Sequence, residues 1–135
     1  MEVKFSRRLD DLESLMSRIK RRMDEIGTIL IYVGVVRGSR GEERVLRLEF
    51  EADEVEMERW MSKLVRDVKA KYGVVDVIVQ HRSGTVKVGE DIMHALVASK
   101  RRAEAFKALS EIIDRIKNES PLRRREVTAG GSYTI

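Results

Sequence analysis

The run TILIYVGVV, residues 28–36, constrains the fold of this chain more than any other stretch. It is almost continuously apolar and rich in β-branched residues, which is the pattern of a strand buried on both faces. Gly34 interrupts the run and indicates a bulge or the close approach of another backbone segment. We therefore expect residues 28–36 to form the central strand of a sheet.

Three other stretches have the three- and four-residue apolar spacing of amphipathic helices. The first is expected to end at Gly27 as its C-cap, the second at Gly73, and the third to begin at Ser99 as its cap and to stop before Pro121. Their apolar stripes consist of Leu9, Leu12, Leu15, Met16, Ile19, Met23 and Ile26; of Val55, Met57, Trp60, Met61, Leu64, Val65, Val68 and Tyr72; and of Ala105, Phe106, Leu109, Ile112, Ile113 and Ile116.

Several shorter stretches predict further strands. Residues 45–51 place Leu46, Leu48 and Phe50 in alternation with charged residues, which indicates a half-buried strand. Residues 74–79 and 92–98 also predict strands, with the turn TVKVGED between them, and the segment from residue 123 to residue 135 predicts two short strands.

Strands that follow one another without crossover helices favour a mixed, largely antiparallel sheet. The fold class is therefore α+β, with about three helices and about six strands. A length of 135 residues fits a single domain over residues 1–135.

The composition narrows the possible functions. Lys and Arg number 27 against 23 Asp and Glu, so the net charge of +4 is only mildly basic and does not by itself indicate nucleic acid. Because the chain has no cysteine and only two histidines, we expect no disulfide, no zinc site and no cofactor. The common nucleotide-binding, metalloprotease and serine-hydrolase fingerprints are also missing from the sequence.

Location and habitat can also be predicted from composition. No N-terminal signal pattern and no apolar stretch of about 18 residues is found, which favours the cytoplasm. The surface is rich in Lys, Arg and Glu, and Gln80 and Asn118 are the only side-chain amides, which is typical of a thermophile protein.

Cationic residues gather at the ends of the predicted elements. Lys117 closes the third helix, and the run SPLRRREV follows it, so a chain reversal at Pro121 would bring Lys117 near the arginines. Alternation along a strand places Arg124 on one face and Arg123 and Arg125 on the other. Arginine holds anions and stays charged, whereas a lysine among arginines can lose its proton and act in catalysis. On the residues alone, a solvated basic face is the more frequent explanation of such a run.

The remaining cations cannot all join that cluster within one chain unless the chain folds back or a second subunit contributes. Arg37 follows the apolar strand, and Arg101 and Arg102 open the third helix. Arg101 and Lys117 would be about 24 Å apart along that helix, so they meet in one site only if the chain folds back or a second subunit contributes.

The two histidines are weaker candidates for a site. His94 lies within an apolar strand and is expected to be a hydrogen-bonded core residue. His81, beside Arg82 at a strand end, is more often structural than part of a pocket, although either role fits the sequence.

Taken in order, four segments resemble the large, catalytic subunit of molybdopterin synthase. They are IGTILIYVGVVRG, LEFEAD, IVQHRSGTVKVGED and ASKRRAEAFKALSEIIDRIKNESPLRRREV, and the resemblance spans about residues 26–133. The combination of VGxVR, HRxG followed by GE, RxxAF, and a lysine followed by proline and a basic pair with glutamate is specific, although each piece alone is weak.

The resemblance implies a fold and an activity. The fold is an α+β hammerhead-type domain that forms a homodimer, with each copy binding a small ubiquitin-like sulfur carrier to give a heterotetramer. The Gly-Gly tail of the carrier, activated as a thiocarboxylate, enters a pocket of the large subunit. Two sulfurs then pass to cyclic pyranopterin monophosphate, which forms the dithiolene of molybdopterin in molybdenum cofactor biosynthesis.

The resemblance also implies residue roles. Lys117 matches a lysine proposed to act directly in sulfur transfer, so it is the catalytic candidate. Arg37 and Arg102 match arginines that line the anion pocket, and Arg101 and Arg124 complete the set of substrate-binding candidates. The family usually has histidine at the position of Arg101 and lysine at that of Arg124, and arginine can keep the anion binding of both but not their proton transfer.

Two alternatives to an active synthase subunit stay open. One is a catalytically impaired paralogue that binds a carrier or a pterin without turnover. The other is a basic nucleic-acid-binding domain, which the low aromatic content of 5% disfavours because bases would find few rings on which to stack.

Overall fold

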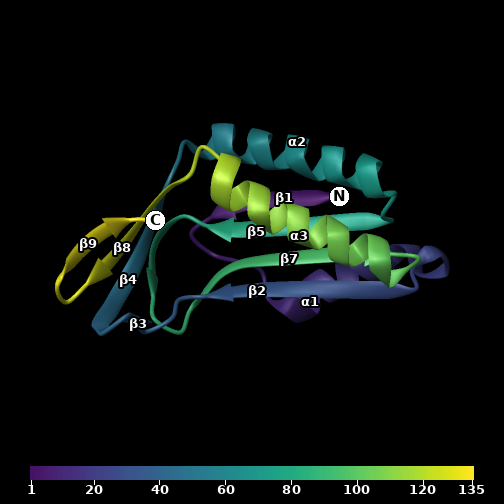
Figure 1. Ribbon diagram of the computed structural model, residues 1–135. Helices are drawn as coiled ribbons and strands as arrows, with labels where there is room; N and C mark the ends of the chain where they lie inside the picture. The colour runs from purple at the N-terminus through teal and green to yellow at the C-terminus, as the bar shows by residue number, and fades with distance from the viewer.

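The computed structural model describes the backbone of residues 1–135 and all side chains except those of residues 22 and 23. Figure 1 shows its elements in order. In the described residues they are β1 (Glu2–Ser6), α1 (Leu12–Ile19), the 3₁₀ helix η1 (Lys20–Glu25), β2 (Thr28–Val35), β3 (Ser39–Arg40), β4 (Glu43–Glu51), α2 (Glu54–Tyr72), β5 (Asp76–Arg82), β6 (Gly84–Lys87), β7 (Asp91–Ser99), α3 (Arg102–Glu119), β8 (Arg123–Thr128) and β9 (Gly131–Thr134).

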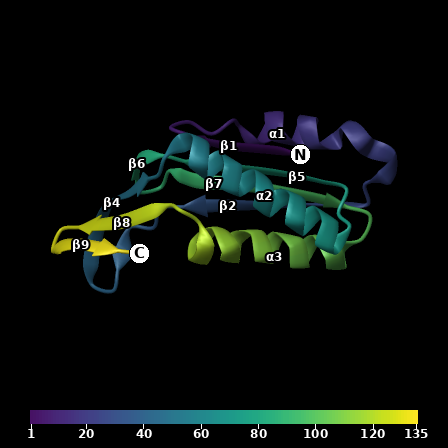
Figure 2. The same cartoon turned by 90° about the horizontal axis from the view of Figure 1, so that it is seen from above.

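A four-stranded sheet forms the centre of the molecule, with its strands in the order β1-β5-β7-β2. The pair β1 and β5 is parallel and the other two pairs are antiparallel. Helices α2 and α3 cover one face of the sheet and α1 covers the other (Figures 1 and 2). Side chains alternate accordingly: Val77 and Val79 pack in the cluster under α2 and α3, whereas Ile78 packs against α1.

A second sheet stands beside the first, where it carries the last strands of the chain (Figure 1). Strand β4 lies in its middle and pairs antiparallel with β3, β6 and β8, and β9 pairs with β8. This sheet has a small core of its own, built from Val36, Val45, Leu48, Phe50 and Val86. The α+β class with mixed, largely antiparallel pairing and three α-helices is therefore confirmed, with the strands divided between two sheets.

Local signals in the sequence explain several element ends. The Asp53 side chain accepts a hydrogen bond from the Glu56 N–H at 2.9 Å and caps α2, which ends at Gly73 in the left-handed conformation, with φ of 66°. Helix α3 stops at Glu119, two residues before Pro121, as predicted. The predicted bulge is found between Gly34 and Val35.

The prediction that residues 28–36 form a central strand is wrong. Strand β2 is the last strand of its sheet and pairs only with β7 in the described chain. Ile31 and Val35 are 41% and 49% exposed. The strand is apolar on both faces because α1 and α3 lie on opposite sides of the sheet even at its edge.

The first helix is shorter than predicted. The α-helical part ends at Ile19 and a 3₁₀ helix continues to Glu25, while the side chain of Met23 lies outside the described residues. Gly27 is not a left-handed C-cap. Its N–H donates to the Ser99 carbonyl at 2.9 Å, and a Cβ at Gly27 would lie 2.2 Å from the carbonyl oxygen of Lys100. Close backbone approach, and not helix termination, explains this glycine.

Three further details differ from the sequence predictions. Strand β1 was not predicted, because its alternating pattern is only five residues long and no turn signal bounds it. Ser99 is the last residue of β7, and Arg101 occupies the N-cap position of α3 without a side-chain hydrogen bond. Leu46 is exposed because the pairing of β4 with β8 shifts register between Val45 and Arg47.

Candidate functional site

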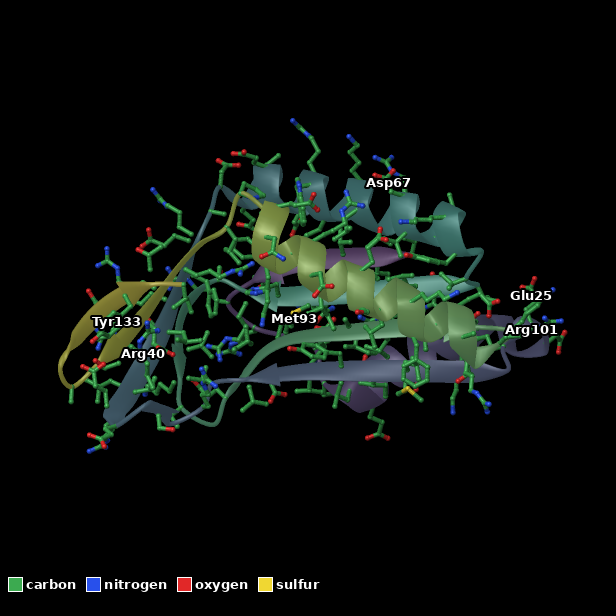
Figure 3. All side chains as sticks on the ribbon, viewed as in Figure 1. Glu25, Arg40, Asp67, Met93, Arg101 and Tyr133 are labelled. Atoms are coloured by element: carbon green, nitrogen blue, oxygen red, sulfur yellow. The ribbon has the colours of Figure 1, made fainter. Side chains whose placement is uncertain are left out.

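A recess of about 460 Å³ lies where the two sheets meet the C-terminal end of α3. In Figure 3, Met93 lies beneath α3, and Arg40 and Tyr133 lie together at the second sheet. The residues that line the recess are Tyr32, Gly34, Val35, Arg37, Arg40, Leu48, Phe50, His81, Ile92, Met93, Ile113, Ile116, Lys117, Asn118, Arg124, Glu126 and Ile135. Most of them are apolar, and cations supply most of the charge.

Four cations converge on this recess from distant parts of the sequence. They are Arg37 just after β2, Arg40 in β3, Lys117 in the last turn of α3 and Arg124 in β8. Glu126 is the one acidic side chain among the described lining residues. A concave surface with this excess of positive charge favours an anionic ligand.

Lys117 borders this recess and also a neighbouring groove of about 460 Å³. Its side chain is exposed, and no described carboxylate lies within ion-pair distance of its ammonium. The groove adds Arg123 and Arg125 to its border, together with Glu49 and Glu51. The amine is therefore accessible from two directions and is not held by an internal ion pair.

Arg124 points inward from β8, whereas Arg123 and Arg125 are exposed, as predicted from strand alternation. Its Nη1 donates to the Lys117 carbonyl at 2.9 Å, and its Nη2 donates to the Ile116 carbonyl. These carbonyls belong to the last turn of α3, where a cation also complements the helix dipole. Partial burial lowers the pKa of Arg124 from its usual value. The side chain thus caps α3 and fixes the position of the Lys117 backbone.

Arg40 is held at the recess by a short network that the sequence analysis did not predict. Its Nη1 lies 3.0 Å from Oε1 of the buried Glu126, and its guanidinium carbon lies 4.1 Å from the centre of the Tyr133 ring. The Tyr133 hydroxyl donates to Glu43 at 2.6 Å, and this hydrogen bond raises the pKa of Tyr133. The contacts tie β9 to β3 and β4 and orient Arg40.

His81 lines the recess from β5 and is 3% exposed. Its Nδ1 lies 2.8 Å from the Arg82 carbonyl oxygen. Burial, with a smaller contribution from the positive charge of Arg124, lowers the pKa of His81 to about 4. The ring is therefore neutral at pH 7. His81 both lines the recess and belongs to the buried core.

Arg101 and Arg102 lie at the other end of α3 from Lys117. Figure 3 shows Arg101 at the end of the molecule opposite Arg40. Neither arginine lines the recess within one chain. The structure therefore brings Arg37, Lys117 and Arg124 together and leaves Arg101 and Arg102 apart from them.

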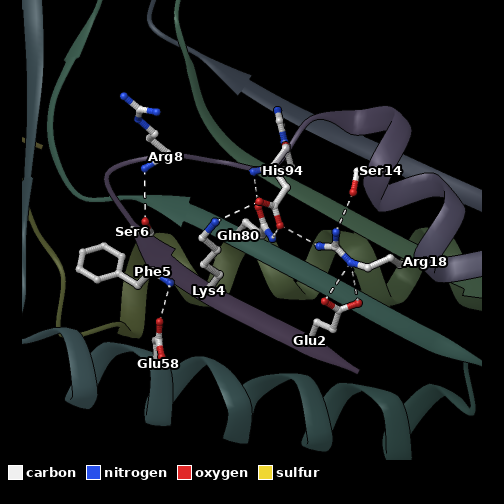
Figure 4. A network of polar contacts seen from close by, with 11 residues as sticks. Glu2, Lys4, Phe5, Ser6, Arg8, Ser14, Arg18, Glu58, Gln80 and His94 are labelled. Atoms are coloured by element: carbon white, nitrogen blue, oxygen red, sulfur yellow. Dashed lines mark hydrogen bonds and ion pairs between the residues drawn. The ribbon is translucent and has the colours of Figure 1, made fainter.

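His94 is a hydrogen-bonded core residue, as predicted. Its Nε2 lies 2.8 Å from Asp91 and its Nδ1 lies 3.1 Å from the Asp10 carbonyl oxygen. Figure 4 shows it next to Gln80, Lys4 and Arg18. Hydrogen bonds from those three side chains, that of Gln80 foremost, lower the pKa of Asp10 well below its usual range. This network joins β1, α1 and β5 on the face opposite α3.

Two classes of site are not found in the described part of the chain. No group of three or more His, Cys, Asp or Glu side chains is placed to hold a metal ion. None of the described helices is long and apolar enough to cross a membrane.

Comparison with protein families gives a match over most of the chain. Residues 7–119 match the family model described as MoaE protein. The molybdopterin synthase catalytic subunit of Thermoplasma volcanium is 34% identical over 118 residues, which cover 87% of this chain and 85% of that protein. The probable molybdopterin synthase of Haloferax volcanii is 34% identical over 92% of this chain, but the chain spans only about half, 49%, of that relative.

Solved structures show the same fold. The molybdopterin biosynthesis MoaE protein from Burkholderia ambifaria superposes with a TM-score of 0.83 at 22% identity, covering 99% of this chain and 88% of the other. A complex of subunits 1 and 2 of molybdopterin-converting factor from Helicobacter pylori contains a chain that superposes with a TM-score of 0.75 at 20% identity, covering 98% and 88%.

Proposed function

The chain belongs to the MoaE protein family, and from that premise we propose that it is the catalytic subunit of a molybdopterin synthase. In this role it transfers sulfur from the thiocarboxylated tail of a small carrier subunit to cyclic pyranopterin monophosphate, forming the dithiolene of molybdopterin. The reactants are both anions, because one is a thiocarboxylate and the other a phosphate.

One observation supports this proposal independently of family membership. An amine without an internal ion pair, Lys117, borders a recess together with Arg37 and Arg124, although the three come from different elements. The guanidinium groups stay charged and can hold the anions, whereas a lysine can exchange its proton or form a covalent bond. The residues present thus match the chemistry that sulfur transfer between two anions requires.

A second copy of the chain supplies the remaining cations in this proposal. One edge of strand β2 pairs with no other strand of the described chain, and its side chains Ile31 and Val35 are exposed. Antiparallel pairing of two β2 strands about a two-fold axis sets the Thr28 end of one strand beside the Val35 end of the other. Thr28 pairs with Ser99, next to the start of α3, and Val35 lines the recess. Arg101 and Arg102 of one copy therefore approach the recess of the other.

The wider assembly and setting belong to the same proposal. The carrier is a small ubiquitin-like protein with a C-terminal Gly-Gly, and the Helicobacter pylori complex of subunits 1 and 2 supports a small-subunit partner. Two copies of the chain and two carriers form a heterotetramer that acts in the cytoplasm of a thermophile.

A reconstituted assay tests the proposal. The purified chain is incubated with thiocarboxylated carrier and pterin precursor, and molybdopterin is measured. The Lys117→Ala variant is expected to lose activity, whereas Lys107→Ala, which removes an exposed lysine of the same helix away from the recess, is expected to keep it. Full activity in Lys117→Ala rules out the catalytic role, and absence of product with the unmodified chain rules out the synthase.

One observation favours a second candidate, a paralogue that binds carrier or pterin without turnover. Arg124 stands where the family usually has lysine, and part of its guanidinium is bonded to the end of α3. If proton transfer at this position is required, the unmodified chain is inactive and Arg124→Lys restores molybdopterin formation in the same assay.

A further inference from the structure

The ring of His81 has a fixed orientation on the wall of the recess. It lies between Phe50, whose ring centre is 4.9 Å away in an edge-to-face contact, and Phe5, whose ring centre is 6.2 Å away. The Nδ1 atom is anchored to the Arg82 carbonyl. Because ring contacts and this hydrogen bond hold it on three sides, the ring cannot turn without disturbing the core.

That orientation determines what His81 offers to a ligand. A carbonyl oxygen only accepts hydrogen bonds, so Nδ1 carries the ring proton, and Nε2 of the neutral ring has a free lone pair. No described residue donates a hydrogen bond to Nε2. Burial and the nearby Arg124 charge keep the ring neutral. The wall of the recess therefore offers an acceptor that no described residue occupies and that a ligand in the recess can reach.

The charged side chains of the recess do not offer a free acceptor. Arg37, Lys117 and Arg124 can only donate while they are protonated. Glu126 is already engaged by Arg40 at 3.0 Å. These cations suit phosphate and carboxylate groups, but they cannot receive an N–H of the same ligand.

The wall near His81 is apolar and partly aromatic. Phe50 contacts the histidine ring directly, and Tyr32, Met93 and Ile113 line the same recess. Such a wall stabilises a flat ring through burial and stacking more than it stabilises a short glycine tail. A flat heterocycle with N–H groups and an attached phosphate would use both the apolar wall and the cations.

We propose that His81 is a substrate-binding residue, whose Nε2 accepts a hydrogen bond from a ring N–H of the pterin while the cations hold the phosphate. This inference rests on the proposed function, because it takes the pterin as the ligand. It assigns recognition of the ring to His81 and recognition of the anion to the arginines and Lys117.

Binding measurements at pH 7 with two separate probes test the proposal. The probes are 6-hydroxymethylpterin, which has the ring without a phosphate, and inorganic phosphate. The variants are His81→Phe, which keeps an aromatic ring without an acceptor, and His81→Gln, whose amide oxygen can accept. Circular dichroism and urea denaturation check that each variant folds.

We expect His81→Phe to bind the pterin about tenfold more weakly than the unmodified chain, the loss of one buried hydrogen bond, with phosphate affinity unchanged. His81→Gln is expected to recover most of the pterin affinity. Equal pterin affinity in His81→Phe and the unmodified chain overturns the proposal, as does an unmodified chain that binds phosphate but no pterin.

Nitrogen NMR of the unmodified chain tests the hydrogen bond to His81 directly, even if the variants fail to fold. Nε2 of His81 should carry no proton at pH 7, and its resonance should move when the pterin is added. His94 is an internal reference because both of its ring nitrogens already have protein partners. A resonance of His81 that stays fixed while the pterin binds overturns the proposal.

The sulfur-transfer assay separates this inference from the proposed function. A chain that binds pterin through His81 but forms no molybdopterin supports the inference and rejects the synthase. A chain that forms molybdopterin with a pterin affinity independent of His81 supports the proposed function and rejects the inference.

Discussion

Arg124 shows how one side chain can serve both the fold and the site. Its two donors satisfy carbonyls of Ile116 and Lys117 that the helix itself leaves unpaired. We expect Arg124→Ala to lower the free energy of unfolding by about 1–3 kcal/mol, because two charge-assisted hydrogen bonds are lost from a partly buried site. Urea denaturation of the variant and the unmodified chain measures the difference.

Arg123→Ala is the matched control for that experiment. Arg123 precedes Arg124 in the same strand but is exposed, and its one ion pair, to Glu51 at 3.3 Å, lies in solvent. A surface pair of this kind contributes little, so the change is expected within about 0.5 kcal/mol. Equal destabilisation by the two substitutions would show that Arg124 does not support the end of α3.

His81 predicts a pH dependence of stability. Its pKa is about 4 in the folded chain and 6.5 for the free side chain, so between these values the unfolded chain binds more protons. The contribution of His81 is complete above pH 6.5 and is lost as the pH falls toward 4, by about 3 kcal/mol in total. Unfolding free energies of the unmodified chain and His81→Gln, measured from pH 7.5 to 4.5, should diverge in slope. Parallel curves would mean that the ring already charges in the folded state.

At this scale the sequence predicts some site residues and not others. The inward direction of Arg124 follows from strand alternation next to Pro121, which is a local rule. The role of His81 depends on the placement of β5 against β4, which carries Phe50, and that of Arg40 depends on the placement of β3 relative to β8, which carries Glu126. Such contacts between residues far apart in sequence have no local signal.

Among the elements, α2 is predicted well because its caps and its apolar stripe agree. Asp53 and Gly73 have the residue types that begin and end helices, and the buried Met57, Met61 and Val65 keep one face. Strand β2 is predicted as a strand but in the wrong place. Its apolar pattern indicates that both faces are covered, but it does not predict whether a strand pairs with each of its edges.

Gly27 offers a test of how β2 and the start of α3 are held together. A Cβ at this position would lie 2.2 Å from the Lys100 carbonyl oxygen, so the two backbones must separate. We expect Gly27→Ala to destabilise the chain by about 1–3 kcal/mol in urea denaturation. In Gly38→Ala the nearest atom is a Val88 methyl at 3.4 Å, so this control should change stability far less. A tolerated Gly27→Ala would show that the close approach is not required.

On the scale of the whole molecule, the candidate site depends on the two sheets meeting at the end of α3. That meeting brings Arg37, Lys117 and Arg124 to one recess and leaves Arg102 at the opposite end of the helix. Helix length alone predicted the separation of the two groups. The chain reversal at Pro121 predicted that Lys117 and Arg124 lie close together, whereas the approach of Arg37 depends on how the two sheets meet and could not be predicted from length or spacing.

The proposed two-fold pairing of β2 strands predicts that each recess takes Lys117 from one copy and Arg102 from the other. Lys117→Ala and Arg102→Ala should each be inactive alone in molybdopterin formation. When the two variants are unfolded together and refolded as an equal mixture, half of the dimers are mixed, and one recess of each mixed dimer has both native residues. About a quarter of the unmodified activity should return, as isologous symmetry requires. The same refolding with Lys117→Ala alone is the control. Two inactive variants that stay inactive when mixed would show that Arg102 does not complete the recess of the other copy.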